Sequence, residues 1–210
     1  MEKDLRKTVI CFGDSNTFGY KPDGSGRFGR RERWPGRLQA LLGDGYRVAE
    51  EGACGRTILF REEGTPDICG LDCIRGALER NRPADLLIVM LGTNDCKTEY
   101  GASPLELAAG LERLAERAVG ILGAPEKVLL IAPAPLGASV EESVWGYAFD
   151  RDSIRKSLAL AEEYKKIAAR GNYRYLDASR VIRASAADCV HLDQEAHGAL
   201  AKAVAELING

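Results

Sequence analysis

The sequence predicts an α/β fold, a three-layer α/β/α sandwich around a five-stranded parallel sheet. Short apolar runs bounded by Gly or Pro alternate with longer segments of helical periodicity along all 210 residues, a pattern typical of parallel strands covered by helices. The most apolar run, 85–91, lies between Pro83 and Gly92, as expected of a central strand buried on both faces. Because no repeat or linker interrupts the pattern, we expect residues 1–210 to form one domain.

The individual elements follow from the same signals. An apolar run that stops at Gly13 predicts the first strand, and Ser103 followed by Pro104 predicts a helix start, because Ser caps helices and Pro suits their first turn. Right-handed crossovers and a switch point beside the first strand predict the strand order 2-1-3-4-5. The expected strands are 9–12, 46–49, 85–91, 128–132 and 173–176. The expected helices are 34–42, 67–80, 103–121, 152–170 and 194–208.

Composition excludes several classes of partner. The chain carries 29 Lys and Arg against 31 Asp and Glu, a net charge of -2, which gives no indication of binding to nucleic acid or to an anionic membrane. No apolar run approaches the ~20 residues of a membrane-spanning helix. The charged segment 1–7 shows no export signal, and the 6 cysteines include no C-x-x-C pair, so we expect a reduced, cytoplasmic protein without a bound metal. The sequence leaves open whether Cys54, Cys96 or Cys189 is exposed.

A candidate nucleophile and a candidate base lie at opposite ends of the chain. Ser15 follows the first strand directly, and ligands bind at the carboxyl ends of strands in open α/β sheets. Serine is also common in turns and caps, so it is weak evidence alone. Asp188 and His191 stand three residues apart, a spacing at which a turn can place the carboxylate against the imidazole and so activate a serine. The alternative is that His191 only enters the last helix, with Asp188 as its local cap, and we interpret His197 as structural.

Acyl transfer also needs hydrogen-bond donors aimed at the oxyanion. The predicted strand ends offer the backbone N–H groups of Ser15 and Gly55 and the side-chain amide of Asn94. Asp95, as a carboxylate, cannot stabilise an oxyanion. We expect it to accept backbone hydrogen bonds and to hold its loop.

Two long connections could border such a site. The loop 20–32 contains G-x-G-x-x-G at 24–29, but no helix follows directly as dinucleotide binding requires, so we expect no cofactor there and interpret it as a mobile loop with solvated arginines. The aromatic connection 136–150 is interpreted as a pocket wall or subunit contact, or as a loop packed on its own domain. The candidates for substrate contact are Asp14, Asn16, Trp34 and Trp145.

Four sequence blocks resemble, in order and spacing, those of the SGNH (GDSL-like) hydrolases, and the resemblance covers nearly the whole chain. It implies the flavodoxin-like SGNH hydrolase fold and metal-free serine catalysis. It also implies that Ser15 is nucleophile and oxyanion donor, that Gly55 and Asn94 are the other donors, and that Asp188 and His191 complete a triad. The blocks are Gly13-Asp14-Ser15-Asn16, Gly55-Arg56-Thr57, Gly92-Thr93-Asn94-Asp95 and Asp188-Cys189-Val190-His191.

Further segments are similar to the bacterial arylesterase/acyltransferase branch of that family. Members cleave short-chain acyl esters, some act on acetylated carbohydrates, and several form oligomers, so the resemblance implies a small acyl ester as substrate and a homo-oligomer. Two positions depart from common family patterns: Asn16 stands where leucine is usual, and Glu50 stands where many members outside the branch have asparagine. The segments are Arg33-Trp34-Pro35, Glu50-Glu51-Gly52, Met90-Leu91-Gly92-Thr93-Asn94-Asp95 and Pro133-Ala134-Pro135-Leu136.

Three functions are compared on this basis. The leading prediction is hydrolysis of short-chain, acetyl-type esters of carbohydrates or aryl alcohols, with transfer of the acyl group to alcohols as an extension. A lysophospholipase or thioesterase acting on longer acyl chains is the alternative, disfavoured because the 20–32 loop has no long apolar lid. A carbohydrate-binding module without catalysis is disfavoured because each position of the triad is chemically competent.

Overall fold

A parallel five-stranded sheet forms the centre of the computed structural model, which describes residues 6–62, 64–65 and 68–210. The strand order is β2-β1-β3-β4-β5, and each neighbouring pair is parallel. The predicted fold class and strand order 2-1-3-4-5 are therefore confirmed. The strands are β1 (Lys7–Gly13), β2 (Tyr46–Gly52), β3 (Leu86–Met90), β4 (Val128–Ala132) and β5 (Arg174–Asp177).

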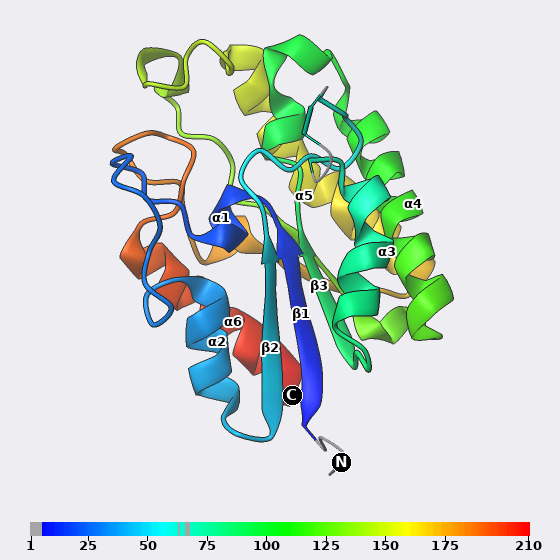
Figure 1. The fold of residues 1–210 in the computed structure, drawn as a ribbon. Coiled ribbons are helices and arrows are strands. Elements are labelled where there is room, and N and C mark those ends of the chain that lie inside the picture. The colour runs from blue at the N-terminus through cyan, green and yellow to red at the C-terminus, as the bar shows by residue number, and fades with distance from the viewer. Residues whose placement is uncertain (1–5, 63, 66–67) are drawn as a thin grey trace.

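Helices cover both faces of this sheet and complete the three layers (Figure 1). Helices α2 and α6 pack together on one face, and α3, α4 and α5 form the layer on the other. The predicted helix at 67–80 begins in part outside the described residues, and the described helix starts at 70. The helices are α1 (Ser15–Phe18), α2 (Trp34–Leu42), α3 (Gly70–Arg80), α4 (Pro104–Leu122), α5 (Arg151–Gly171) and α6 (Gln194–Asn209).

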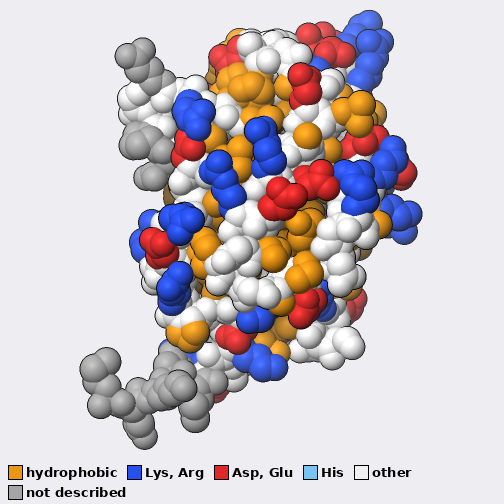
Figure 2. All heavy atoms as spheres, turned by 90° about the vertical axis from the view of Figure 1, so that its right-hand side faces the viewer, with side chains coloured by type: hydrophobic (Ala, Val, Ile, Leu, Met, Phe, Trp, Pro, Cys, Tyr) orange, Lys and Arg blue, Asp and Glu red, His pale blue; other side chains and the backbone are white. Residues whose placement is uncertain are grey.

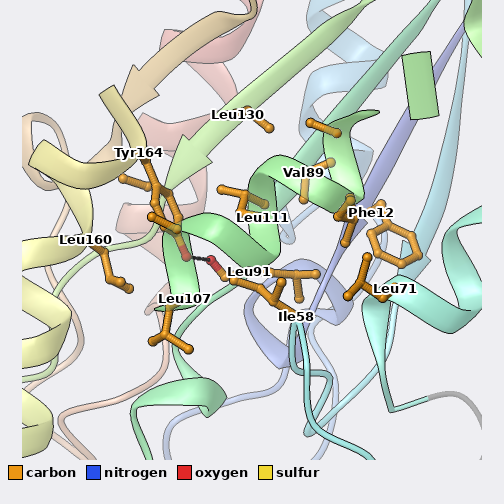
Figure 3. Close-up of a cluster of buried hydrophobic side chains, with 14 of the residues drawn as sticks. Phe12, Ile58, Leu71, Val89, Leu91, Leu107, Leu111, Leu130, Leu160 and Tyr164 are labelled. Carbon is orange, nitrogen blue, oxygen red and sulfur yellow. Dashed lines mark hydrogen bonds between the residues drawn. The ribbon is translucent and has the colours of Figure 1, made fainter. Parts of the chain in front are cut away.

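Alternation along the strands divides the core in two. In β1, Ile10 and Phe12 belong to the cluster beneath α3, α4 and α5, whereas Val9 and Cys11 belong to the cluster beneath α2 and α6. Figure 3 shows the first cluster, in which the hydroxyl of buried Tyr164 donates to the backbone carbonyl of Leu91 at 3.1 Å. Burial of the sheet on both faces fixes the strand ends, where the candidate residues stand.

The predicted start of α4 is confirmed in atomic detail. The Ser103 hydroxyl accepts from the backbone N–H of Glu106, and the Glu106 carboxylate accepts from the backbone N–H of Ser103 at 2.8 Å, which is a capping box. Asp150 and Ser153 form the equivalent box at the start of α5. These caps end the connecting loops at defined positions.

The short helix α1 was not expected from the sequence, which predicts only a sharp exit after Gly13. The Asp14 carboxylate accepts from the backbone N–H of Asn16 at 2.9 Å and caps this single turn. Gly19 ends it at φ +88°, in the left-handed region that favours glycine. Ser15 is thus the first residue of a capped helix rather than part of a loose turn.

The surface mixes both signs of charge. On the face that α3 and α4 cover, basic and acidic side chains are interspersed with hydrophobic ones (Figure 2). Within the described residues, no helix combines the length and apolar character that crossing a membrane requires.

Candidate active site

Three predicted residues from the two ends of the chain meet at the carboxyl end of β1. The Ser15 Oγ lies 3.0 Å from His191 Nε2, and His191 Nδ1 lies 2.5 Å from Asp188 Oδ2. All three side chains are buried: Ser15 is 7% exposed, His191 4% and Asp188 1%. Figure 1 shows the loop that precedes α6 beside the loop that follows α1. The hydroxyl, imidazole and carboxylate therefore form one continuous hydrogen-bonded chain.

The turn from Asp188 to His191 holds itself in place. Asp188 Oδ1 accepts from the backbone N–H groups of Val190 at 3.0 Å and His191 at 2.9 Å, and Cys189 adopts φ +63°. Burial acts to raise the pKa of Asp188, but hydrogen bonds from the His191 side chain and from these two N–H groups outweigh it and hold that pKa below its usual value. Asp193, not Asp188, caps α6, which disfavours the alternative that His191 is only a helix-entry residue.

Asn16 fastens this turn to the helix that carries the serine. Its Nδ2 donates to the Val190 carbonyl at 3.3 Å, and its Oδ1 accepts from the Leu192 backbone N–H at 2.9 Å. Both ends of the amide thus bind backbone that lies 174 and 176 residues away in sequence. Asn16 connects the two halves of the candidate site.

Three of the residues predicted to contact substrate are buried and bind other parts of the chain. Asp14 (1% exposed) caps α1, Asn16 (5% exposed) binds the turn 188–191, and Trp34 (0% exposed), the first residue of α2, packs in the core between α2, α6 and the sheet. The backbone N–H of Trp34 donates to Nδ1 of His197 at 3.2 Å, and burial lowers the pKa of His197 to about 3. His197 is thus the structural histidine that the sequence predicted.

Two aromatic side chains border the imidazole of His191. The Trp145 ring meets it edge to face, with centroids 5.5 Å apart, and the Tyr20 ring lies 4.7 Å from it at 47°. Trp145 Nε1 also donates to Asp188 Oδ2 at 3.1 Å. The connection 136–150 therefore packs on its own domain and reaches the site through Trp145. Sequence reasoning missed Tyr20, for which an aromatic residue directly after Gly19 was the available signal.

The predicted oxyanion donors come from the ends of three neighbouring strands, β1, β2 and β3. Asn94 Nδ2 donates one hydrogen bond to the Arg56 carbonyl at 3.1 Å, which fixes the amide beside the turn containing Gly55. Gly55 adopts φ +79°, and in the described chain neither its backbone N–H nor that of Ser15 has an acceptor. Asp95 accepts from the Ile58 backbone N–H at 2.8 Å, which confirms its predicted role in holding this loop.

Two buried carboxyl groups lie behind the serine. Burial raises the pKa of Asp14 to about 6 and that of Asp95 to about 7, and backbone hydrogen bonds offset only part of this effect. The charge of Asp14 also acts to raise the pKa of Asp95. Both groups are thus able to change charge near neutral pH.

The sequence predicted that the 20–32 loop is mobile and that its arginines are solvated. In the structure, ion pairs with Glu50 hold this loop in place. Arg33 is largely buried and binds Glu50 through two hydrogen bonds of 2.5 and 3.0 Å, while Arg27 reaches the same carboxylate at 3.1 Å. Arg30 and Arg31 are exposed, as expected. Glu50, the second departure from common family patterns, is therefore the anchor of this loop. Of the thiols left open by the sequence, Cys54 is exposed and the other two are buried.

Comparison with known proteins agrees with this geometry. The family model described as GDSL-like Lipase/Acylhydrolase matches residues 11–199. The chain belongs to the GDSL-like lipase/acylhydrolase family. The match includes the serine, the glycine and asparagine donors, and the Asp-His turn. Both the resemblance and the enzyme class predicted from the sequence, ester hydrolase, are those of this family.

Solved structures and one characterised relative extend the likeness of this GDSL-like chain. A carbohydrate acetylesterase from Sinorhizobium meliloti superposes with a TM-score of 0.87 at 32% identity, covering 97% of this chain and 99% of that one. The aryl esterase of M. smegmatis gives 0.88 at 31% identity, covering 97% and 98%. An acetylxylan esterase from Xylanibacter ruminicola is 32% identical over 119 residues, which are 57% of this chain and 23% of that protein. The chain thus matches less than a quarter of that longer relative.

Proposed function

We propose that the protein is a serine esterase that hydrolyses short-chain, acetyl-type esters of carbohydrates or aryl alcohols. The observation that carries the proposal is the buried chain from Ser15 Oγ through His191 to Asp188, with contacts of 3.0 and 2.5 Å. This is the arrangement that a serine requires to become a nucleophile.

In the proposed reaction, His191 Nε2 takes the proton of Ser15 while the serine Oγ attacks the ester carbonyl. Collapse of the tetrahedral intermediate breaks the bond to the alcohol, which leaves with the proton returned by His191. Water then repeats the sequence on the acyl-enzyme and releases the carboxylic acid. The lowered pKa of Asp188 keeps this carboxylate ionised, so it can stabilise the imidazolium that forms in each half-reaction.

The oxyanion would be held by the N–H groups of Ser15 and Gly55 and by the amide of Asn94. The lack of an acceptor for the two backbone groups in the described chain, and the second N–H of Asn94, support this assignment. Loss of one such donor typically costs about 10²–10³ in turnover. Asn94→Ala is therefore expected to lower kcat by that factor.

The substrate class follows from the relatives. Two of them are named for acetyl esters of carbohydrates and one for aryl esters. An alcohol that reaches the acyl-enzyme before water would give acyl transfer. We further propose a homo-oligomer, which light scattering at several protein concentrations tests.

The experiment compares Ser15→Ala with Ser25→Ala, an exposed serine of the neighbouring loop. Ser15→Ala should abolish p-nitrophenyl acetate hydrolysis and labelling by a fluorophosphonate, whereas Ser25→Ala should retain both. A series of p-nitrophenyl esters should peak at the acetyl or butyryl ester, and acetylated xylo-oligosaccharides should release acetate. A maximum at octanoyl or longer would instead favour a lysophospholipase or thioesterase, and full activity of Ser15→Ala would refute the serine mechanism.

A further inference from the structure

One carboxylate oxygen in the site receives two side-chain donors. Asp188 Oδ2 accepts from His191 Nδ1 at 2.5 Å and from Trp145 Nε1 at 3.1 Å. The other oxygen, Oδ1, accepts from two backbone N–H groups of the same turn. A carboxylate can accept about four hydrogen bonds, so donors from the protein occupy all the positions of Asp188. The indole is the one of these donors that comes from outside the turn 188–191.

The loop that carries Trp145 holds the indole in place. Its backbone N–H donates to Ser143 Oγ at 3.1 Å, and its carbonyl accepts from the N–H of Ala148 at 2.8 Å. The same loop makes a second contact with the turn 188–191, where the Gly137 N–H donates to the Cys189 carbonyl at 2.8 Å. A loop fixed at two points on the turn can set the orientation of the carboxylate.

We propose that Trp145 is a positioning residue of the triad, which holds Asp188 Oδ2 against His191 Nδ1 and withdraws part of its negative charge. The inference rests on the proposed function and adds to it. An indole N–H donates but neither accepts nor titrates near neutral pH, so it fixes the carboxylate equally in both protonation states of the histidine. Without it, the orientation of the carboxylate would be less fixed, which slows catalysis. Because the backbone N–H groups of the turn still hold Oδ1, Oδ2 would stay beside the imidazole with more of its negative charge, and His191 would lose its proton at higher pH.

Other ionisable groups lie near the same imidazole, and their titration must be distinguished from that of His191. Asp14, which follows β1, has a pKa raised to about 6 by burial and interacts with the charge of His191, and Tyr20 and His197 approach from the 20–32 loop and from α6. Asp95, whose pKa burial raises to about 7, interacts in turn with Asp14. An activity profile alone could therefore report on Asp14. The chain has 2 histidines, and the pKa of His197 is lowered to about 3, so NMR of labelled histidine follows His191 directly.

The test replaces Trp145 with Phe, which keeps an aromatic ring and removes only the N–H. The control is Tyr147→Phe, because Tyr147 is 79% exposed in the same loop and its ring lies 6.0 Å from that of Trp145. In W145F the titration midpoint of His191 should rise by about half to one pH unit, and the acid limb of kcat/KM should move with it. We expect kcat to fall several-fold, with a smaller change in KM. Y147F should leave the midpoint unchanged.

A second measurement needs no variant. The chain has 2 tryptophans, and the indole N–H of Trp34 is buried without an acceptor in the described chain. The Trp145 indole resonance should shift as His191 titrates, while that of Trp34 should not. An unmoved Trp145 resonance, or a W145F midpoint equal to that of the wild type, would overturn the proposal. If Ser15→Ala keeps full activity while W145F still moves the His191 midpoint, the proposed function fails and the assignment of Trp145 to Asp188 survives.

Discussion

Replacing Asn16 tests whether the two ends of the chain are held together by one side chain. Leucine is the informative replacement, because its side chain has the same number of heavy atoms, branched at the same carbon, and cannot form either hydrogen bond. In N16L the Leu192 N–H, now bonded at 2.9 Å, and the Val190 carbonyl, at 3.3 Å, would lose their partner while remaining buried. The variant would thus lack both hydrogen bonds that connect α1 to the segment 190–192.

The expected magnitude follows from those two groups. An orphaned buried donor costs about 1–3 kcal/mol, and the longer bond to Val190 contributes about 0.5–1.5 kcal/mol. We therefore expect N16L to lower the free energy of unfolding by roughly 2–4 kcal/mol. Misplacement of a catalytic group by about 1 Å can cost 10²-fold in rate, so kcat for p-nitrophenyl acetate should fall about 10- to 100-fold.

The assay combines urea unfolding followed by tryptophan fluorescence with steady-state kinetics. Asn209→Ala is the matched control, since Asn209 is exposed at the end of α6. It should change the free energy of unfolding by less than about 0.5 kcal/mol. The reasoning is refuted if N16L stays within that range of the wild type and retains full kcat.

Three further changes probe the scaffold around the site. Tyr164→Phe leaves the Leu91 carbonyl without its donor and should cost about 1–2 kcal/mol in urea unfolding, with kcat unchanged. Glu50→Gln breaks the paired contact with Arg33 and should lower the urea midpoint by the equivalent of about 1–2 kcal/mol. Burial raises the pKa of Asp95 to about 7, so its contribution to stability is present below the unfolded value near 4 and is lost as pH rises through about 7. Asp95→Asn should therefore reduce the loss of unfolding free energy between about pH 5 and pH 8.

The fold could be predicted from the sequence because its signals are local. A buried parallel strand needs a continuous apolar run, and 128–132 is read directly as β4. The prediction stopped β2 three residues early, at 49 instead of Gly52. The reason is that Glu50 and Glu51 resemble loop residues until their distant partners, Arg33 and Arg80, are known.

The expected proximity of Ser15, His191 and Asp188 is present in the structure, whereas the contacts that hold them in place could not be predicted from the sequence. Residue type and spacing indicate Ser15, Asp188 and His191 as candidates, and the structure brings them within hydrogen-bond distance. The roles of Asn16 and Trp145 depend instead on contacts between residues 174, 176 and 43 positions apart. No local pattern encodes such contacts, so a polar or aromatic residue near the serine was interpreted as a substrate contact.

Contacts of this kind explain how a short turn can be held at a fixed distance from Ser15. The turn 188–191 lies between β5 and α6 rather than within the sheet, so the sheet alone cannot fix its distance from Ser15. Asn16 binds it from the serine side, and Trp145 and Gly137 bind it from the loop before α5. Removing any one contact should therefore loosen the turn, while leaving the strands and their core intact. Variants at these supports should therefore lower kcat as well as the free energy of unfolding, whereas a core variant such as Tyr164→Phe should lower the free energy of unfolding and leave kcat unchanged.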